Sequence, residues 1–222
     1  MQTVSLARRI EHAVLSPDAT AEDLARGVQV AVRWGVRALV VKPCHVAAAA
    51  RLLAGAGVKL VAVVGFPHGS QTTETKVQET RQAVARGVAE VDMVLNIGAL
   101  RQEDLAAVFY DIRAVVEAAD GRPVKVILET CYLEDPQKRL ACRLAAHAGA
   151  AYVKTSTGFG AKGATVADVA LMRRTVGTRL GVKAAGGIRS YPDVLALIQA
   201  GADLIGTSHT EAILTQSARE AA

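Results

Sequence analysis

One lysine interrupts a pattern in which a charged residue is not expected. Lys154 ends the apolar segment Ala151-Tyr152-Val153 and is followed by the turn Thr155-Ser156-Thr157-Gly158-Phe159-Gly160. The apolar segment predicts a buried β-strand, and buried strands seldom carry a lysine without a specific reason. A desolvated amine near a second cation loses its proton easily, and the neutral amine can then attack carbonyl groups. Lys154 is therefore the first candidate catalytic residue.

A second lysine and an aspartate interrupt two other apolar segments in the same way. Lys183 lies within Gly181–Ala185, and Asp92 lies within Val91–Leu95. Because side chains alternate along a strand, Asp92 faces away from the apolar positions that must meet covering helices, and so faces inward. We expect Lys154 and Lys183 to point inward from neighbouring strands, where two like charges disfavour the ammonium form. The alternative for each lysine is a side chain that reaches solvent and pairs with an acid.

Glycine-rich turns follow two of the expected strands and indicate an anion site. In parallel barrels, phosphate often binds beside the last two strands, to backbone N–H groups that glycine leaves accessible. The candidate donors are the N–H groups of Gly187, Thr207 and Ser208, although ordinary turns would also explain the glycines. The candidate substrate- and phosphate-binding residues are Thr157, Gly158, Gly186, Gly187, Gly206, Thr207 and Ser208.

Glu129 follows another apolar segment and has two interpretations. It is either a proton shuttle or a packed carboxylate that pairs with Lys125 or with a lysine of a neighbouring strand. The three cysteines, Cys44, Cys131 and Cys142, form no C-x-x-C motif and show no metal-ligand spacing with histidine. We therefore expect no metal, no cofactor, reduced thiols and a cytoplasmic protein.

A recurring unit organises the chain around these residues. Five apolar segments each follow a glycine, at Gly35, Gly57, Gly87, Gly149 and Gly201, and two unusually long gaps each contain one more apolar segment. With a weaker segment at Ile10–Val14, eight strands are expected. The others are Ala38–Val41, Leu60–Val64, Val91–Leu95, Val124–Leu128, Ala151–Val153, Gly181–Ala185 and Leu204–Gly206.

Helical patterns separate these strands. Strands that alternate with helices predict a parallel sheet, and eight units in 222 residues favour a closed (β/α)8 TIM barrel over an open doubly wound sheet. The whole chain, 1–222, is expected to form one domain. The expected helices are Ala21–Arg33, Thr72–Ala85, Glu103–Ala118, Asp135–Ala148, Val166–Thr175 and Pro192–Ala200.

Composition argues against several other classes of function. The net charge is +5, but the basic residues are scattered, and only 4% of residues are aromatic. A nucleic-acid interface would need a clustered basic face, so we expect none. No apolar run reaches the length of about 18 residues that a membrane span needs, and we expect no membrane partner.

Together these segments resemble the deoxyribose-phosphate aldolase family. The resemblance is carried by Val153-Lys154-Thr155-Ser156-Thr157-Gly158-Phe159, by Val182-Lys183-Ala184-Ala185-Gly186-Gly187-Ile188-Arg189, and by the segments around Asp92, Glu129 and Gly206. It implies a class I aldolase that cleaves 2-deoxy-D-ribose 5-phosphate to D-glyceraldehyde 3-phosphate and acetaldehyde without a metal. It also implies that Lys154 forms the Schiff base, that Lys183 keeps Lys154 neutral, and that Asp92 is a general acid/base. A homodimer is expected, because proteins of this family are often dimeric.

Two departures from the family pattern concern the substrate site. The usual Ile-Asp-His-Thr is here Ile10-Glu11-His12-Ala13, which affects substrate binding if these residues contact hydroxyl groups or order a water molecule. His209 replaces a small residue after Gly206-Thr207-Ser208 and either adds a donor or narrows the site. Glu11, Glu129 and His209 are therefore further candidates. The alternatives in function are another phosphate-binding barrel enzyme, such as a sugar-phosphate epimerase or a different Schiff-base aldolase, and a non-catalytic sugar-phosphate-binding barrel.

Overall fold

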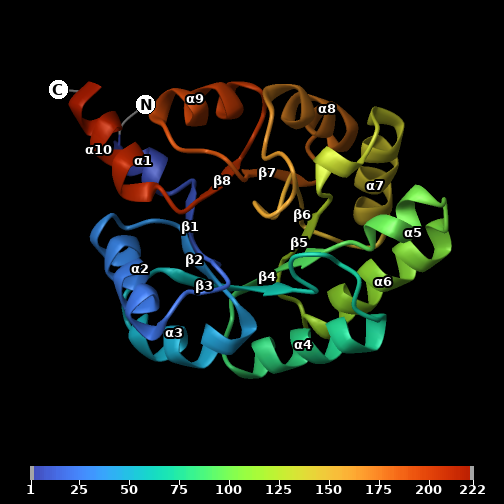
Figure 1. Ribbon diagram of the computed structural model, residues 1–222, viewed down its shortest axis with the longest axis horizontal. Helices are drawn as coiled ribbons and strands as arrows, with labels where there is room; N and C mark the ends of the chain where they lie inside the picture. Colours follow the sequence, from blue (N-terminus) through green and yellow to red (C-terminus); the bar gives the residue numbers. More distant parts are fainter. Residues whose placement is uncertain (1–2, 221–222) are drawn as a thin grey trace.

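The computed structural model describes residues 3–220 and is a closed barrel of eight parallel strands (Figure 1). The strands follow one another in chain order, and the helices surround them. The predicted (β/α)8 fold is confirmed, and every expected strand is present within one or two residues of its expected bounds. The strands are β1 (Ile10–Val14), β2 (Ala38–Val41), β3 (Lys59–Val64), β4 (Glu90–Val94), β5 (Val124–Ile127), β6 (Tyr152–Lys154), β7 (Gly181–Ala185) and β8 (Leu204–Thr207).

All six expected helices form, with side-chain caps at several of their first turns. Thr20 and Asp23 form a capping box at the start of α2, and Pro136 and Pro192 lie in the first turns of α7 and α9. The helices are α2 (Ala21–Arg33), α4 (Thr73–Ala85), α6 (Leu105–Ala118), α7 (Asp135–His147), α8 (Val166–Val176) and α9 (Tyr191–Gln199).

Four further helices were not expected from the sequence. Three of them, α1, α3 and α5, have only 5 to 7 residues, and α10 follows β8. Helix α3 has no side-chain hydrogen bond at its N-cap that would predict its start. Asn96, two residues after β4, caps α5 by accepting a hydrogen bond from Ala99 N at 3.0 Å. The four are α1 (Thr3–Ala7), α3 (Val46–Leu52), α5 (Ile97–Arg101) and α10 (Thr210–Glu220), and short 3-10 turns cover Pro43–His45 and Thr130–Tyr132.

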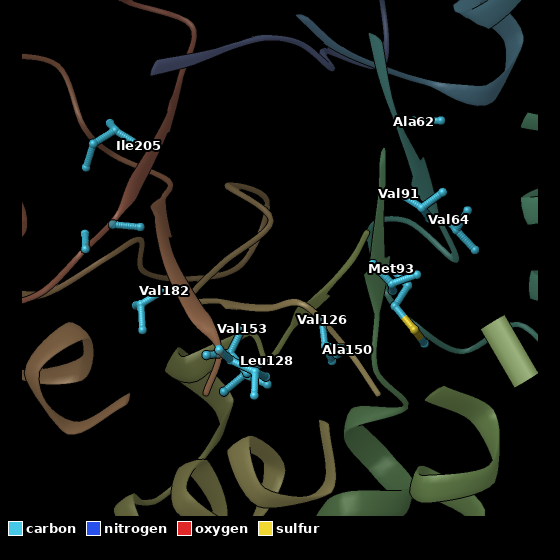
Figure 2. Packing of buried hydrophobic residues seen from close by; sticks show 14 of the residues in the cluster. Ala62, Val64, Val91, Met93, Val126, Leu128, Ala150, Val153, Val182 and Ile205 are labelled. Atoms are coloured by element: carbon cyan, nitrogen blue, oxygen red, sulfur yellow. The ribbon is translucent and has the colours of Figure 1, made fainter. Parts of the chain in front are cut away.

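The strands separate two environments. Their outward side chains pack beneath the helices in one large apolar cluster, to which Val91, Met93, Val126 and Val153 belong (Figure 2). The predicted inward orientation of Asp92 is thereby confirmed, since its neighbours Val91 and Met93 face the helices. The interior has a much smaller apolar cluster, formed by Ala38, Val40, Val61 and Val63 of β2 and β3.

The first and last described helices lie together, and glycines connect several helices to the strands that follow them. Helices α1 and α10 pack against each other on one side of the barrel (Figure 1). The glycines that precede five of the strands all have positive φ, from 57° at Gly35 to 111° at Gly201, as expected for residues that follow a helix. No helix within residues 3–220 is long and apolar enough to cross a lipid bilayer.

One buried ion pair outside the barrel ties β4 to two helices. Lys76 of α4 is fully buried, and its Nζ lies 2.6 Å from Asp111 Oδ2 of α6 and 3.0 Å from the carbonyl oxygen of Val94. Asp111 also accepts a hydrogen bond from Thr73 at 2.9 Å. A single lysine thus fixes the end of β4, two residues beyond Asp92.

Replacing Lys76 with alanine should therefore be costly, because it leaves the carboxylate of Asp111 buried without a cation. We expect the free energy of unfolding in urea to fall by about 3–5 kcal/mol. The matched control is the double variant Lys76→Met/Asp111→Leu, which removes both charges and should regain most of the loss. A loss below about 1 kcal/mol for Lys76→Ala would contradict this role.

Candidate active site

Lys154 and Lys183 are direct neighbours across the β6–β7 pair, as the sequence predicts. Both are almost completely buried, and both reach the same carboxylate oxygen of Asp92. Lys154 Nζ lies 2.8 Å from Asp92 Oδ2, and Lys183 Nζ lies 2.7 Å from it. Three strands, β4, β6 and β7, thus bring the two lysines and the aspartate together inside the barrel.

Burial is the largest influence on the Lys154 amine. It lowers the pKa of Lys154 to about 8, against the opposing effect of Asp92 and with the help of the positive charge on Lys183. The sequence predicted both desolvation and crowding by a second lysine, and of these two causes desolvation contributes more. Burial favours the neutral carboxyl of Asp92, yet Lys125, Lys154 and Lys183 together hold its pKa well below the usual range. The site therefore combines an ionised acid with an easily deprotonated amine.

Lys125 binds the other carboxylate oxygen of Asp92. Its Nζ lies 2.9 Å from Asp92 Oδ1 and 2.7 Å from Glu90 Oε2. Burial disfavours its charge, but the surrounding carboxylates raise its pKa above the usual value. The predicted alternative in which Glu129 pairs with Lys125 is wrong.

Glu129 follows β5, and its carboxylate binds the turn after β6. It accepts hydrogen bonds from the Thr157 hydroxyl and from Thr157 N, the latter at 3.2 Å. Burial raises the pKa of Glu129, although the Thr157 donors oppose this effect. The Thr157 hydroxyl, which also accepts from Phe159 N at 3.0 Å, is thus engaged in holding the turn.

Glu11 lies below the cavity and does not line it. Its carboxylate is fully buried and pairs with Lys183 and with Arg37. Glu11 thus faces charged groups of the barrel interior, whereas Ala13, two residues further along β1, lines the cavity. The longer glutamate in place of aspartate serves an interior ion pair.

A cavity of about 690 Å³ opens above the two lysines at the C-terminal end of the barrel. Its volume is in the range of small-molecule sites. The structure places Lys154, Lys183 and His209 along its wall, whereas Asp92 and Glu129 lie outside the lining. All seven candidate binding residues also line it: Thr157, Gly158, Gly186, Gly187, Gly206, Thr207 and Ser208.

The glycine turns fit closely because they lack side chains. A Cβ at Gly206 would lie 3.1 Å from Lys183 Cε, so the absence of a side chain there makes room for the lysine. A Cβ at Gly163 would lie 2.1 Å from the carbonyl oxygen of Gly186, where Ala164 N donates a hydrogen bond at 3.0 Å. Thr207 joins the last two turns, since its hydroxyl donates to Ile188 O at 2.8 Å. The turns after β6, β7 and β8 thus form one packed unit.

Sequence reasoning missed several charged residues of the cavity and of the barrel interior. Asp18, Asp23 and Arg26 line the cavity on the side of β1 and α2. Arg189 lines the cavity two residues beyond Gly187, and its place in the glycine turn was a usable signal. Arg37 and Glu90 lie at the opposite end of the barrel, and only the closed sheet brings them together. Within residues 3–220, no cluster of three or more His, Cys, Asp or Glu side chains is arranged to hold a metal ion.

A buried, weakly basic lysine below a cavity at the C-terminal end of a parallel barrel defines a class, the barrel enzymes that act on carbonyl compounds through an amine. The chain belongs to the DeoC/LacD family of aldolases, whose family model matches residues 3–208.

Individual relatives agree with this assignment. The chain is 50% identical to a deoxyribose-phosphate aldolase of Streptococcus sanguinis, over 95% of this chain and 96% of the relative. It is 51% identical to deoxyribose-phosphate aldolase 1 of Bacillus licheniformis, over 93% of each chain. The solved deoxyribose phosphate aldolase of Aeropyrum pernix, described as tetrameric, superposes with a TM-score of 0.92 at 35% identity, over 100% of this chain and 94% of that one.

The reactivity of Lys154 should depend on pH in a way that its environment sets. Only the neutral amine captures an aldehyde, so the rate of capture should rise with pH and level off above a midpoint near 8. The measurement is brief exposure to acetaldehyde at each pH, reduction with borohydride under one common condition, and peptide mapping. Exposed lysines in the same digest are the internal control, because ordinary lysines titrate near 10.4. A Lys154 profile that coincides with theirs would contradict the prediction.

Proposed function

We propose that this chain is a class I aldolase that reversibly cleaves 2-deoxy-D-ribose 5-phosphate to D-glyceraldehyde 3-phosphate and acetaldehyde. The observation that carries the proposal is the pair Lys154 and Lys183 in register at the cavity wall, with burial lowering the pKa of Lys154 to about 8. The substrate agrees with the names of relatives about 50% identical to this chain.

The reaction begins when the neutral amine of Lys154 attacks the aldehyde carbon of the open-chain sugar. Loss of water gives an iminium ion, which withdraws electrons from the neighbouring carbon–carbon bond. Removal of the proton from the C3 hydroxyl breaks the C2–C3 bond, releases glyceraldehyde 3-phosphate and leaves an enamine on Lys154. Protonation of the enamine at C2 and hydrolysis then release acetaldehyde.

We assign different tasks to Asp92 and Lys183 in this sequence. Asp92 has a strongly lowered pKa and does not reach the cavity, so it holds no proton to donate and acts as the counter-ion of the cationic nitrogen. The family resemblance implied a general acid/base role for Asp92. Lys183 does line the cavity and shares Oδ2 of Asp92 with Lys154, which makes it the better proton carrier.

Replacing the nucleophile provides the direct test. We expect Lys154→Ala and Lys154→Arg to lose cleavage of deoxyribose 5-phosphate and covalent capture of acetaldehyde, because neither side chain supplies a neutral primary amine. Lys183→Met should keep part of the capture and lose about 10²–10⁴-fold in kcat. The matched control is Lys138→Met on α7, which lies outside the cavity. Equal cleavage rates for Lys154→Ala and the unchanged protein would refute the proposal.

The second part of the proposal is that the glycine turns hold the phosphate group. Two charge-assisted hydrogen bonds to N–H groups contribute about 3 kcal/mol, so 2-deoxyribose without phosphate should be at least roughly 100-fold poorer in kcat/KM. Comparable kcat/KM values for the two sugars would count against this site.

Gly187 offers a matched pair of variants for the same question. Its Cβ position faces open space, and asparagine and aspartate are the side chains that best tolerate its φ of 74°. Gly187→Asp should abolish the preference for the phosphorylated sugar by repelling the dianion, whereas the nearly isosteric Gly187→Asn should keep most of it.

We also propose that residues 1–222 act as one domain in the cytoplasm and as a homodimer. The three cysteines are unpaired, and the relative from Aeropyrum pernix is described as a tetramer, which supports assembly within the family. Size-exclusion chromatography with light scattering distinguishes a dimer from a monomer or tetramer.

A further inference from the structure

A column of charged side chains runs from Lys154 to the opposite end of the barrel. Asp92 connects Lys154 to Lys125, and Lys125 lies 2.7 Å from Glu90. Glu90 in turn accepts two hydrogen bonds from Arg37, at 2.6 and 3.0 Å. Arg37 directly precedes β2 and Glu90 opens β4, so both lie at the N-terminal end, remote from the cavity.

A second branch of the column closes it into a ring of ion pairs. Glu11 pairs with Lys183 above and with Arg37 below, and its Oε1 lies 3.5 Å from Lys125 Nζ. Arg37 therefore contacts carboxylates of both branches. Any change of charge at Arg37 is transmitted through buried groups, where solvent screening is weak.

The charges of the column balance only when Lys154 is neutral. Three buried carboxylates, Glu11, Glu90 and Asp92, face the three cations Arg37, Lys125 and Lys183. The ammonium form of Lys154 would add a fourth positive charge. Three other groups face the column. Lys59 pairs with Glu90 but is half exposed, and the ring of Tyr152 lies about 6 Å from Arg37 and Lys125. Glu129, which binds the turn after β6, adds a negative charge on the side of Lys154.

We propose that Arg37 and Glu90 are positioning residues that set, with opposite sign, how readily Lys154 gives up its proton. Neither residue touches the cavity. They act through the ion-pair column, and the proposal rests on the proposed function in that Lys154 is taken as the reactive amine.

The sign of each effect follows from the count of charges. Without Arg37 the column has one carboxylate in excess, so the ammonium form of Lys154 is stabilised and its deprotonation moves to higher pH. Without the charge of Glu90 the column has one cation in excess, so deprotonation moves to lower pH. Coulomb interactions across a buried site of this size give shifts on the order of one pH unit in each direction.

The test uses four forms of the full chain: the unchanged protein, Arg37→Met, Glu90→Gln, and the double variant Arg37→Met/Glu90→Gln. Each is exposed briefly to acetaldehyde over a range of pH and then reduced with borohydride under one common condition. Capture at Lys154 is quantified by peptide mapping. We expect the midpoint to rise in Arg37→Met, to fall in Glu90→Gln and to return close to the original value in the double variant.

Charge-conserving variants separate charge from packing. Arg37→Lys and Glu90→Asp alter the geometry of the column but not its number of charges. Both variants should therefore keep the original pH midpoint of capture at Lys154. If Arg37→Met does not fold, the Glu90→Gln shift and its reversal in the double variant decide the question. Four indistinguishable midpoints, or shifts of the same sign in both single variants, would overturn the proposal.

The capture experiment also separates this inference from the proposed function. If all forms capture acetaldehyde with equal pH midpoints, the proposed role of Arg37 and Glu90 is wrong, but the aldolase proposal is unaffected. Capture with the expected shifts, but without cleavage of deoxyribose 5-phosphate, supports the column and refutes the proposed substrate. Failure of the unchanged protein to capture acetaldehyde would overturn both, because Lys154 would then not be the reactive amine.

Discussion

The carboxylate of Asp92 is the group on which the charged interior depends. Its two oxygens meet three lysines from three different strands, and a fully buried anion is stable only with such compensation. The same contact has two consequences for Lys154. It holds Lys183 close enough to make a second ammonium group unfavourable, and it places a fixed counter-ion beside any cation that forms on the Lys154 nitrogen. A single aspartate thus joins β4 to β5, β6 and β7 and also determines the electrostatics of the site.

The barrel interior is divided between two kinds of packing. Around β2 and β3 it is apolar, with Val40, Val61 and Val63 as its main side chains, and this part resembles an ordinary barrel core. Strands β1, β4, β5, β6 and β7 instead contribute the side chains of the interior ion pairs. Because ion pairs do not by themselves favour folding over apolar packing, we interpret the charged part as a device for function, and we attribute most of the stability to the apolar cluster outside the strands.

Much of this organisation could be predicted from local patterns in the sequence. Alternation along β4 gave the inward orientation of Asp92, and the glycine that ends each helix gave the spacing of the strands. The partners of Glu11 could not be predicted, because Lys183 lies 172 positions away and is reached only when the barrel closes. Arg37 and Glu90 were missed for the same physical reason, since only the closed sheet brings the starts of β2 and β4 together. The short helix α3 carries no capping side chain and so leaves little local signal.

The close packing of glycine backbones around Gly186 limits how this enzyme can change. A side chain at Gly163 must displace the turn of Gly186, because its Cβ would lie 2.1 Å from the carbonyl oxygen of Gly186. At Gly186 a Cβ would lie 3.1 Å from Gly163 Cα, and a φ of 88° disfavours any side chain there. Gly187 faces open space, and Ser208 and His209 are exposed on the same wall. A substitution at one of these open positions therefore disturbs the packing of the turns less than one at Gly163 or Gly186. His209 occupies one of these open positions, and this makes it a suitable first position to vary in directed evolution toward other aldehydes.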